Sequence, residues 1–193
     1  MPVRRLASVA LIGLAIVLSA CGGSSATPGS GQVSLPPGSP SVEFAESAKL
    51  AATLPDSVGG KSLQKGSLNV LQLYSTGNSA ANILTLFIAG LGVSPSQVGV
   101  AAAVDDQGMI QIIAAQFTGV ASSAIQAQAE TVAKGVDPNV TLANTTIGGK
   151  SVTTATYPNS HTGPVISYIT GDTLYLVQSS DPALAEDALK QLP

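Results

Sequence analysis

Three kinds of side chain occur in the order Ser, Asp, His, the set that serine hydrolases use. Ser79 stands in "GNSAA" at 77–81, Asp105 and Asp106 follow, and His161 is the only histidine in the chain. In such an enzyme the histidine accepts the serine proton and the carboxylate orients the histidine. The segment around Ser79 also lies between a predicted strand and a predicted helix, which is the setting of a hydrolase nucleophile.

The surrounding sequence argues against this chemistry. The motif G-x-S-x-G needs a second glycine, and Ala81 occupies that position. The chain also lacks the repeated alternation of strands and helices that such hydrolases have. Asn78 and Ser79 are residue types that cap helices. We therefore expect no catalytic residues and no enzymatic activity, with a serine hydrolase as a minor alternative.

The tetrapeptide "GGKS" occurs twice, at 59–62 and 148–151. A phosphate-binding loop needs a glycine five residues before its Gly-Lys pair, and Pro55 and Asn144 stand there instead. A helix should follow the serine of such a loop, whereas both copies precede a predicted strand. We interpret both as hairpin turns flanked by solvated lysines. The matching "VGGKSL" and "IGGKSV" leave duplication of a half-domain open as an alternative.

A metal site is not expected either. The chain has one histidine and one cysteine, so a transition-metal site would depend on carboxylates. Asp105 and Asp106 could bind calcium weakly, but they lack the spacing of an EF-hand, and a turn explains them better. We expect no cofactor.

Cys21, the only cysteine, ends a distinctive N-terminal segment. "MPVRR" at 1–5 is basic, and the 13 residues 6–18 are apolar. That run is shorter than the roughly 20 residues that cross a bilayer, but it suits the apolar part of a secretory signal. "LSAC" at 18–21 follows at once.

This order of features resembles a bacterial lipoprotein signal peptide with its lipobox. The resemblance covers residues 1–21 only. It implies that the Cys21 sulfur receives a diacylglycerol, that a signal peptidase cuts between Ala20 and Cys21, and that the new amino group can be acylated. The implied location is the cell membrane, on the extracytoplasmic side. The alternatives are an uncleaved N-terminal anchor or an ordinary signal peptide with a chance cysteine.

The composition divides the chain into three parts. Residues 1–20 are the expected signal peptide. Residues 21–41, the lipidated cysteine and a Gly-, Ser- and Pro-rich stretch, are the expected linker. Residues 42–193 are the expected extracytoplasmic domain, a size that can bury a core without disulfides or metals.

Charge and aromatic content exclude one class of partner. After residue 21 there are six lysines against 11 acidic residues, a net charge of −5. Binding nucleic acid requires clustered basic residues, so we expect no nucleic-acid partner. Three Phe, four Tyr and no Trp also disfavour an aromatic binding platform.

Apolar periodicity predicts four helices. In residues 41–55 Phe44, Ala48, Ala51 and Leu54 share a face and Pro55 ends the helix. In 79–92 Ile83, Leu86, Phe87 and Leu91 form the buried stripe, with Gly92 after the C-terminus. In 122–135 Ser123 and Gln126 form a capping box. In 181–193 Asp181 is the N-cap, Pro182 is the first helical residue, and Leu184, Ala188, Leu189 and Leu192 face inward.

Alternation and turn residues predict the strands. Residues 56–74 contain a Gly-Gly turn and a strand with Leu68, Val70 and Tyr74 on one face and Leu71 and Leu73 on the other. Residues 97–104 and 109–117 form a hairpin around "DDQG". Four further strands, at 140–147, 150–157, 164–170 and 173–180, form a meander.

These elements predict a single α+β domain with an antiparallel sheet of about five to seven strands and about four helices packed on it. The expected function is a membrane-anchored lipoprotein with a non-catalytic protein- or ligand-binding domain. The alternative is a carrier of a lipid or another apolar ligand, because short runs of small apolar residues such as "GVAAAV" could line a cavity.

Overall fold

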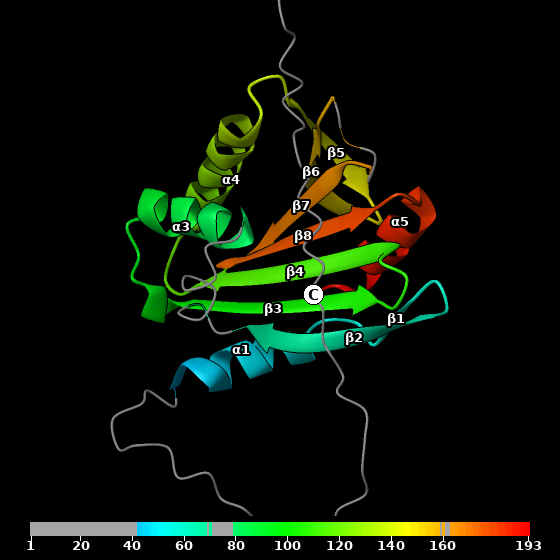
Figure 1. Ribbon diagram of the computed structural model, residues 1–193, viewed down its shortest axis with the longest axis horizontal. Helices are drawn as coiled ribbons and strands as arrows, with labels where there is room; N and C mark the ends of the chain where they lie inside the picture. Colours follow the sequence, from blue (N-terminus) through cyan, green and yellow to red (C-terminus); the bar gives the residue numbers. More distant parts are fainter. Residues whose placement is uncertain (1–41, 69, 71–78, 159, 161–162) are drawn as a thin grey trace, which may run out of the picture.

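The computed structural model describes residues 42–193, apart from 69, 71–78, 159 and 161–162. Eight antiparallel strands form one sheet, and four helices and a short 3-10 helix complete the described part of the fold (Figure 1). The helices are α1 (Val42–Ala52), α3 (Ser79–Leu91), η1 (Pro95–Gln97), α4 (Ser122–Val136) and α5 (Pro182–Gln191). The strands are β1 (Ser57–Val58), β2 (Lys61–Leu68), β3 (Val98–Asp105), β4 (Ile110–Phe117), β5 (Thr141–Ile147), β6 (Lys150–Thr156), β7 (Val165–Thr170) and β8 (Thr173–Ser179).

The strand order is β1-β2-β3-β4-β8-β7-β6-β5, so the sheet consists of two four-stranded halves that meet at the β4–β8 pair. The α+β class and the antiparallel sheet are confirmed. The sheet has eight strands, where five to seven were expected. The additional strand is β1, whose two residues pair with the start of β2 across Gly59 and Gly60. A strand of two residues leaves no alternation in the sequence to detect.

Both "GGKS" segments form the predicted hairpin turns. Gly59 and Gly60 have φ of 56° and 75°, and Gly148 and Gly149 have φ of 59° and 80°. Two consecutive positive φ values are what a tight two-residue hairpin of this hand requires, and glycine adopts them without steric cost. Strand β2 begins at Lys61 and β6 at Lys150, so neither turn opens a helix.

Helices cover both faces of the sheet. On one face α1 and α5 pack over a core that includes Leu50, Leu189, Ala103 and Val177. On the other face α3 and α4 pack over a second core around Phe117, where the Phe87 and Phe117 rings stack with centroids 5.8 Å apart. Because both faces are covered, β3 is buried at nearly every position, and successive residues enter opposite cores.

The C-terminal helix forms as predicted. The Asp181 carboxylate accepts a hydrogen bond from the Ala183 backbone N–H at 2.9 Å, and Pro182 is the first helical residue. The four residues expected to face inward are all buried: Leu184, Ala188, Leu189 and Leu192. Here the cap, the proline and the apolar stripe all specify the same helix.

The buried stripes of α1 and α3 differ from those predicted. In α1 Ser47 and Leu50 are buried together with Leu54, while Ala48 is exposed. A serine takes an inward position because its Oγ accepts the Val100 backbone N–H at 3.3 Å, and hydropathy alone does not reveal this.

In α3 Phe87 is buried as predicted, but its neighbours exchange roles: Ile88 is buried and Leu86 is 51% exposed. Gly92 follows the helix with φ 66°, as expected of a residue that ends a helix.

Two further predictions were wrong. No side chain caps α4: its N-cap is Ala121, and Gln126 binds the sheet instead. The strand predicted to include Val70 ends at Leu68, and Val70 is helical and buried in the core under α3 and α4. Leu71, Leu73 and Tyr74 lie outside the described residues.

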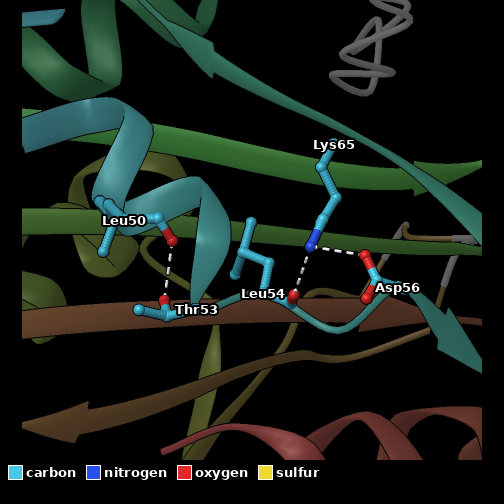
Figure 2. A network of polar contacts seen from close by, with 5 residues as sticks. All are labelled: Leu50, Thr53, Leu54, Asp56 and Lys65. Carbon is cyan, nitrogen blue, oxygen red and sulfur yellow. Dashed lines mark hydrogen bonds and ion pairs between the residues drawn. The ribbon is translucent and has the colours of Figure 1, made fainter. Parts of the chain in front are cut away.

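Lys65 holds the C-terminal end of α1 against β2 (Figure 2). Its Nζ donates to the Leu54 carbonyl at 3.0 Å and lies 2.7 Å from the Asp56 carboxylate. The Thr53 hydroxyl donates to the Leu50 carbonyl at 2.7 Å. Leu54 and Asp56 follow α1, which ends at Ala52, so Lys65 fixes the segment after the helix against β2.

Candidate ligand-binding pocket

The residues considered for covalent chemistry are only partly described. Cys21 and His161 lie outside the described residues, so neither lipidation nor a Ser-His pair is tested. Ser79 is the first residue of α3, in agreement with its predicted place at a helix start.

Asp105 has a structural role in the β3–β4 turn. Its side chain is buried, and Oδ1 accepts the Ile110 backbone N–H at 2.9 Å. Oδ2 is buried without a hydrogen-bond partner, while Asp106 is exposed. In the part of the chain that the structure describes, no three His, Cys, Asp or Glu side chains gather as metal ligands would. The prediction of a turn at these residues is confirmed.

The two "GGKS" lysines lie directly after the turns, as predicted, and each makes a solvent-exposed hydrogen bond. The Lys61 Nζ donates to the Gln107 side-chain oxygen at 3.2 Å. The Lys150 Nζ donates to the Pro193 main-chain oxygen at 2.9 Å and lies 4.7 Å from the centre of the Tyr168 ring. Both lysines therefore join elements distant in sequence.

The feature most suited to binding is a partly open pocket of about 550 Å³ between the sheet and helices α3 and α4. Small-molecule sites typically occupy about 300–1,000 Å³ and are mainly apolar. The sheet wall comes from β4 to β8, and α4 supplies most of the opposite wall. The apolar lining residues are Ile83, Phe87, Ile113, Ala129, Val132, Ala133, Val136, Pro138, Leu142, Ala155, Val165 and Leu176.

Strand register arranges the sheet wall in two neighbouring rows of side chains. One row crosses five strands in the order Ile113, Leu176, Ser167, Thr153 and Asn144. Its apolar end lies on the central strands β4 and β8, and its polar end lies on β7, β6 and the edge strand β5.

The second row runs across the same strands as Gln111, Gln178, Val165, Ala155 and Leu142. Here the polar residues lie on the central strands and the apolar residues lie on β7, β6 and β5. The polar end of each row therefore lies beside the apolar end of the other row.

A hydrogen-bonded chain joins α4 to the polar end of the first row. The Gln126 Nε2 donates to Thr153 Oγ1 and to Glu130 Oε1, both at 2.9 Å. The Thr153 hydroxyl donates to Asn144 Oδ1 at 2.6 Å, and the Ser167 hydroxyl donates to the Thr153 carbonyl at 3.1 Å. The Gln126 side chain is therefore bound to the sheet through Thr153, and it in turn holds Glu130 at the pocket.

A second polar group lies where α4 ends, at Asp137 and Tyr157. Burial, and secondarily the negative charge of Asp137, raises the pKa of the Tyr157 hydroxyl above its ordinary value. The hydroxyl is therefore protonated at neutral pH and available as a hydrogen-bond donor. Among the lining residues that the structure describes, the charged side chains are Glu130 and Asp137, both acidic.

Sequence reasoning did not identify these lining residues. The meander strands and α4 were predicted, but α4 lies across the meander through long-range packing that leaves no local signal. The misassigned capping box at Gln126 was the nearest indication, since a partly buried glutamine needs a hydrogen-bond partner.

Comparisons with known proteins give no match from which a function could be inferred, so we infer function from the fold and the pocket. No family model matches the chain, and neither the curated proteins nor the solved structures give a match. Among the described residues, no helix has the length and apolar character needed to cross a bilayer.

Proposed function

We propose that this protein is a non-catalytic, membrane-anchored extracytoplasmic lipoprotein whose domain binds an apolar ligand between its sheet and α4. The observation that carries the proposal is the pocket of about 550 Å³ with its mainly apolar lining. Of the two functions that the sequence left open, a pocket of this kind favours an apolar ligand over a protein partner. The anchor is the part implied by the lipobox at Cys21.

The side chains of α4 explain why the space is not filled. Protein interiors normally pack as densely as organic crystals, so a large gap in a wall of apolar residues is unusual. The turns of α4 that line the pocket present the small residues Ala129 and Ala133 beside Val132 and Val136. An occupant would bury the apolar side chains that now line the gap, which stabilises a complex by about 25 cal/mol per Å² of apolar surface.

Filling the pocket from α4 tests the proposal. Ala133→Trp places a large ring among the lining residues, and Ala127→Trp places the same ring on an exposed position of the same helix. We expect Ala133→Trp to weaken binding of the neutral probe Nile red by at least about tenfold. We expect Ala127→Trp to bind as the unchanged protein does.

Thermal unfolding of both variants separates lost binding from lost fold. Native mass spectrometry of the protein purified from membranes gives an independent measurement, since a bound lipid adds its mass. If the unchanged protein binds no apolar probe and carries no lipid, the proposal is wrong.

A further inference from the structure

We propose, resting on the function above, that the pocket selects a single-chain amphiphile with an uncharged, hydroxyl-bearing head group, such as a monoacylglycerol. It would discriminate against the same chain carrying a carboxylate. The inference depends on the charge of the lining, the chemistry of the hydrogen-bonded chain at Gln126, and the volume of the pocket.

The charge of the lining disfavours an anionic head group. Glu130 and Asp137 are acidic, and no lysine, arginine or histidine is among the described residues that line the pocket. A fatty-acid carboxylate would therefore lose its hydration without gaining a counter-ion. It would also be repelled by Glu130, an interaction that strengthens as the pocket loses water.

The polar corner is suited to hydroxyl groups. It consists of the Gln126 amide, the Thr153 and Ser167 hydroxyls, and one carboxylate, that of Glu130. Of the two Glu130 oxygens, only Oε1 takes part in a hydrogen bond among the described residues. The other oxygen can accept from a ligand hydroxyl. An uncharged hydroxyl also costs much less to remove from water than an ammonium group does.

The volume suits one acyl chain. At about 550 Å³ the pocket lies within the roughly 300–1,000 Å³ that small-molecule sites occupy. One long acyl chain with part of a small head group is a ligand of that size.

Photolabelling of the full chain in phosphatidylcholine vesicles tests the selectivity. The probe is a monoacylglycerol that carries a diazirine on its chain, and the competitors at pH 8 are monoolein, oleate and oleylamine, which share one chain. We expect monoolein to compete at a concentration at least about tenfold lower than oleate. We expect the labelled peptides to come from α4, β6 and β7.

Glu130→Gln isolates the charge. In this variant we expect the concentrations at which monoolein and oleate compete to differ by no more than about threefold. Oleate should compete better than before, while monoolein should change little. Glu186→Gln is the matched control, since Glu186 is an exposed acid on α5 that pairs with Lys190 at 2.7 Å on the other side of the sheet. It should leave the difference between monoolein and oleate unchanged.

The possible results separate this inference from the proposed function. Equal competition by oleate, stronger competition by oleylamine than by monoolein, or an unchanged difference between monoolein and oleate in Glu130→Gln overturns the head-group selectivity while the pocket still binds lipid. Absence of any competed labelling on the pocket peptides overturns the proposed function itself.

Discussion

Tyr175 is buried at the centre of the sheet face that α1 and α5 cover. Its ring stacks on that of Tyr168, its partner on β7, with centroids 6.0 Å apart. Its hydroxyl lies 3.4 Å from the Thr53 hydroxyl. Burial is the main cause that raises the pKa of Tyr175 above its ordinary value of 10.0, and the Thr53 contact opposes part of that effect.

This raised pKa makes stability depend on pH at the alkaline end. Below the unfolded pKa of 10.0 both states are protonated and the contribution of Tyr175 is fully present. As pH rises toward the higher folded value, the unfolded chain releases its proton first, so the free energy of unfolding falls. We expect urea denaturation between about pH 9 and 11 to show a shallower fall in Tyr175→Phe than in the unchanged protein.

Parallel curves for the two proteins over this range would contradict the prediction. The phenylalanine variant keeps the ring stack on Tyr168, so a difference between the curves reports the hydroxyl. Tyr157 is present in both proteins and contributes equally to both curves.

Single residues were predictable where local chemistry decides their place. Asp181 is an N-cap because its carboxylate bonds two residues along the chain, and Gly92 ends α3 because it has a positive φ. Ser47 and Gln126 were not predictable, since their partners are Val100 and Thr153 on distant strands. A polar residue that is buried by a long-range hydrogen bond looks exposed in a hydropathy pattern.

At the scale of elements, α5 lies against both Gly-Gly turns. The Gly59 backbone N–H donates to Asp187 Oδ2 at 2.7 Å. On the other side, a Cβ added at Gly148 would lie 3.0 Å from the Glu186 carbonyl oxygen and 3.3 Å from the Lys190 nitrogen. These turns belong to the two edge hairpins of the sheet, so α5 joins its two ends.

Gly148 and Gly149 form a matched pair for testing this contact. Both have positive φ, but an added Cβ at Gly149 meets no atom within 4 Å. We expect Gly149→Ala to lower the free energy of unfolding by about 1–2 kcal/mol through left-handed backbone strain alone. We expect Gly148→Ala to lower it by at least about 1 kcal/mol more, because the Cβ displaces the α5 backbone. Denaturant titration of the two variants measures the difference.

Equal destabilisation would mean that α5 shifts away from the turn at no cost. The elements themselves were largely predictable, because the β3–β4 hairpin, the β5 to β8 meander and α5 each have turn or cap residues at both ends. The arrangement of α4 over the meander was not, and it is this arrangement that forms the pocket.

At the scale of the whole molecule, the two halves of the sheet repeat one order of hairpins. Strands β1 to β4 run in chain order from one edge of the sheet to its centre, and β5 to β8 run in chain order from the other edge. The two halves meet at the β4–β8 pair. Val58 and Leu63 in one half and Ile147 and Val152 in the other occupy matching positions beside the "GGKS" turns, and all four contact the core under α5. The echo in the sequence therefore corresponds to equivalent places in the fold.

The halves differ in the connection between their hairpins. Residues 69–97, which include α3, join β2 to β3, whereas only residues 157–164 join β6 to β7. Helix α3 supplies Phe87 to the core over the first half. Four of the five strands that line the pocket, β5 to β8, belong to the second half. The pocket thus lies mainly on the half with the shorter connection.

The proposed anchor is tested on the full chain in its membrane. We expect the unchanged full chain to enter the detergent-rich phase of a Triton X-114 separation and Cys21→Ser to remain in the aqueous phase, because a diacylglycerol thioether holds a protein on the bilayer. Mass spectrometry of the N-terminal peptide checks for the lipid directly. Gly23→Ser is the neighbouring control, and absence of lipid on the unchanged Cys21 would refute the anchor.

The central β4–β8 pair also constrains how the chain folds. Ile113 pairs with Leu176, so the strands that join the two halves are separated by the whole of α4 and the β5 to β7 segment. Because this pairing joins residues far apart in the sequence, we expect it to slow the completion of the sheet. A folding rate limited by this pairing would fall with substitutions at Ile112 or Val177, whereas changes in the β5–β6 edge hairpin would mainly speed unfolding.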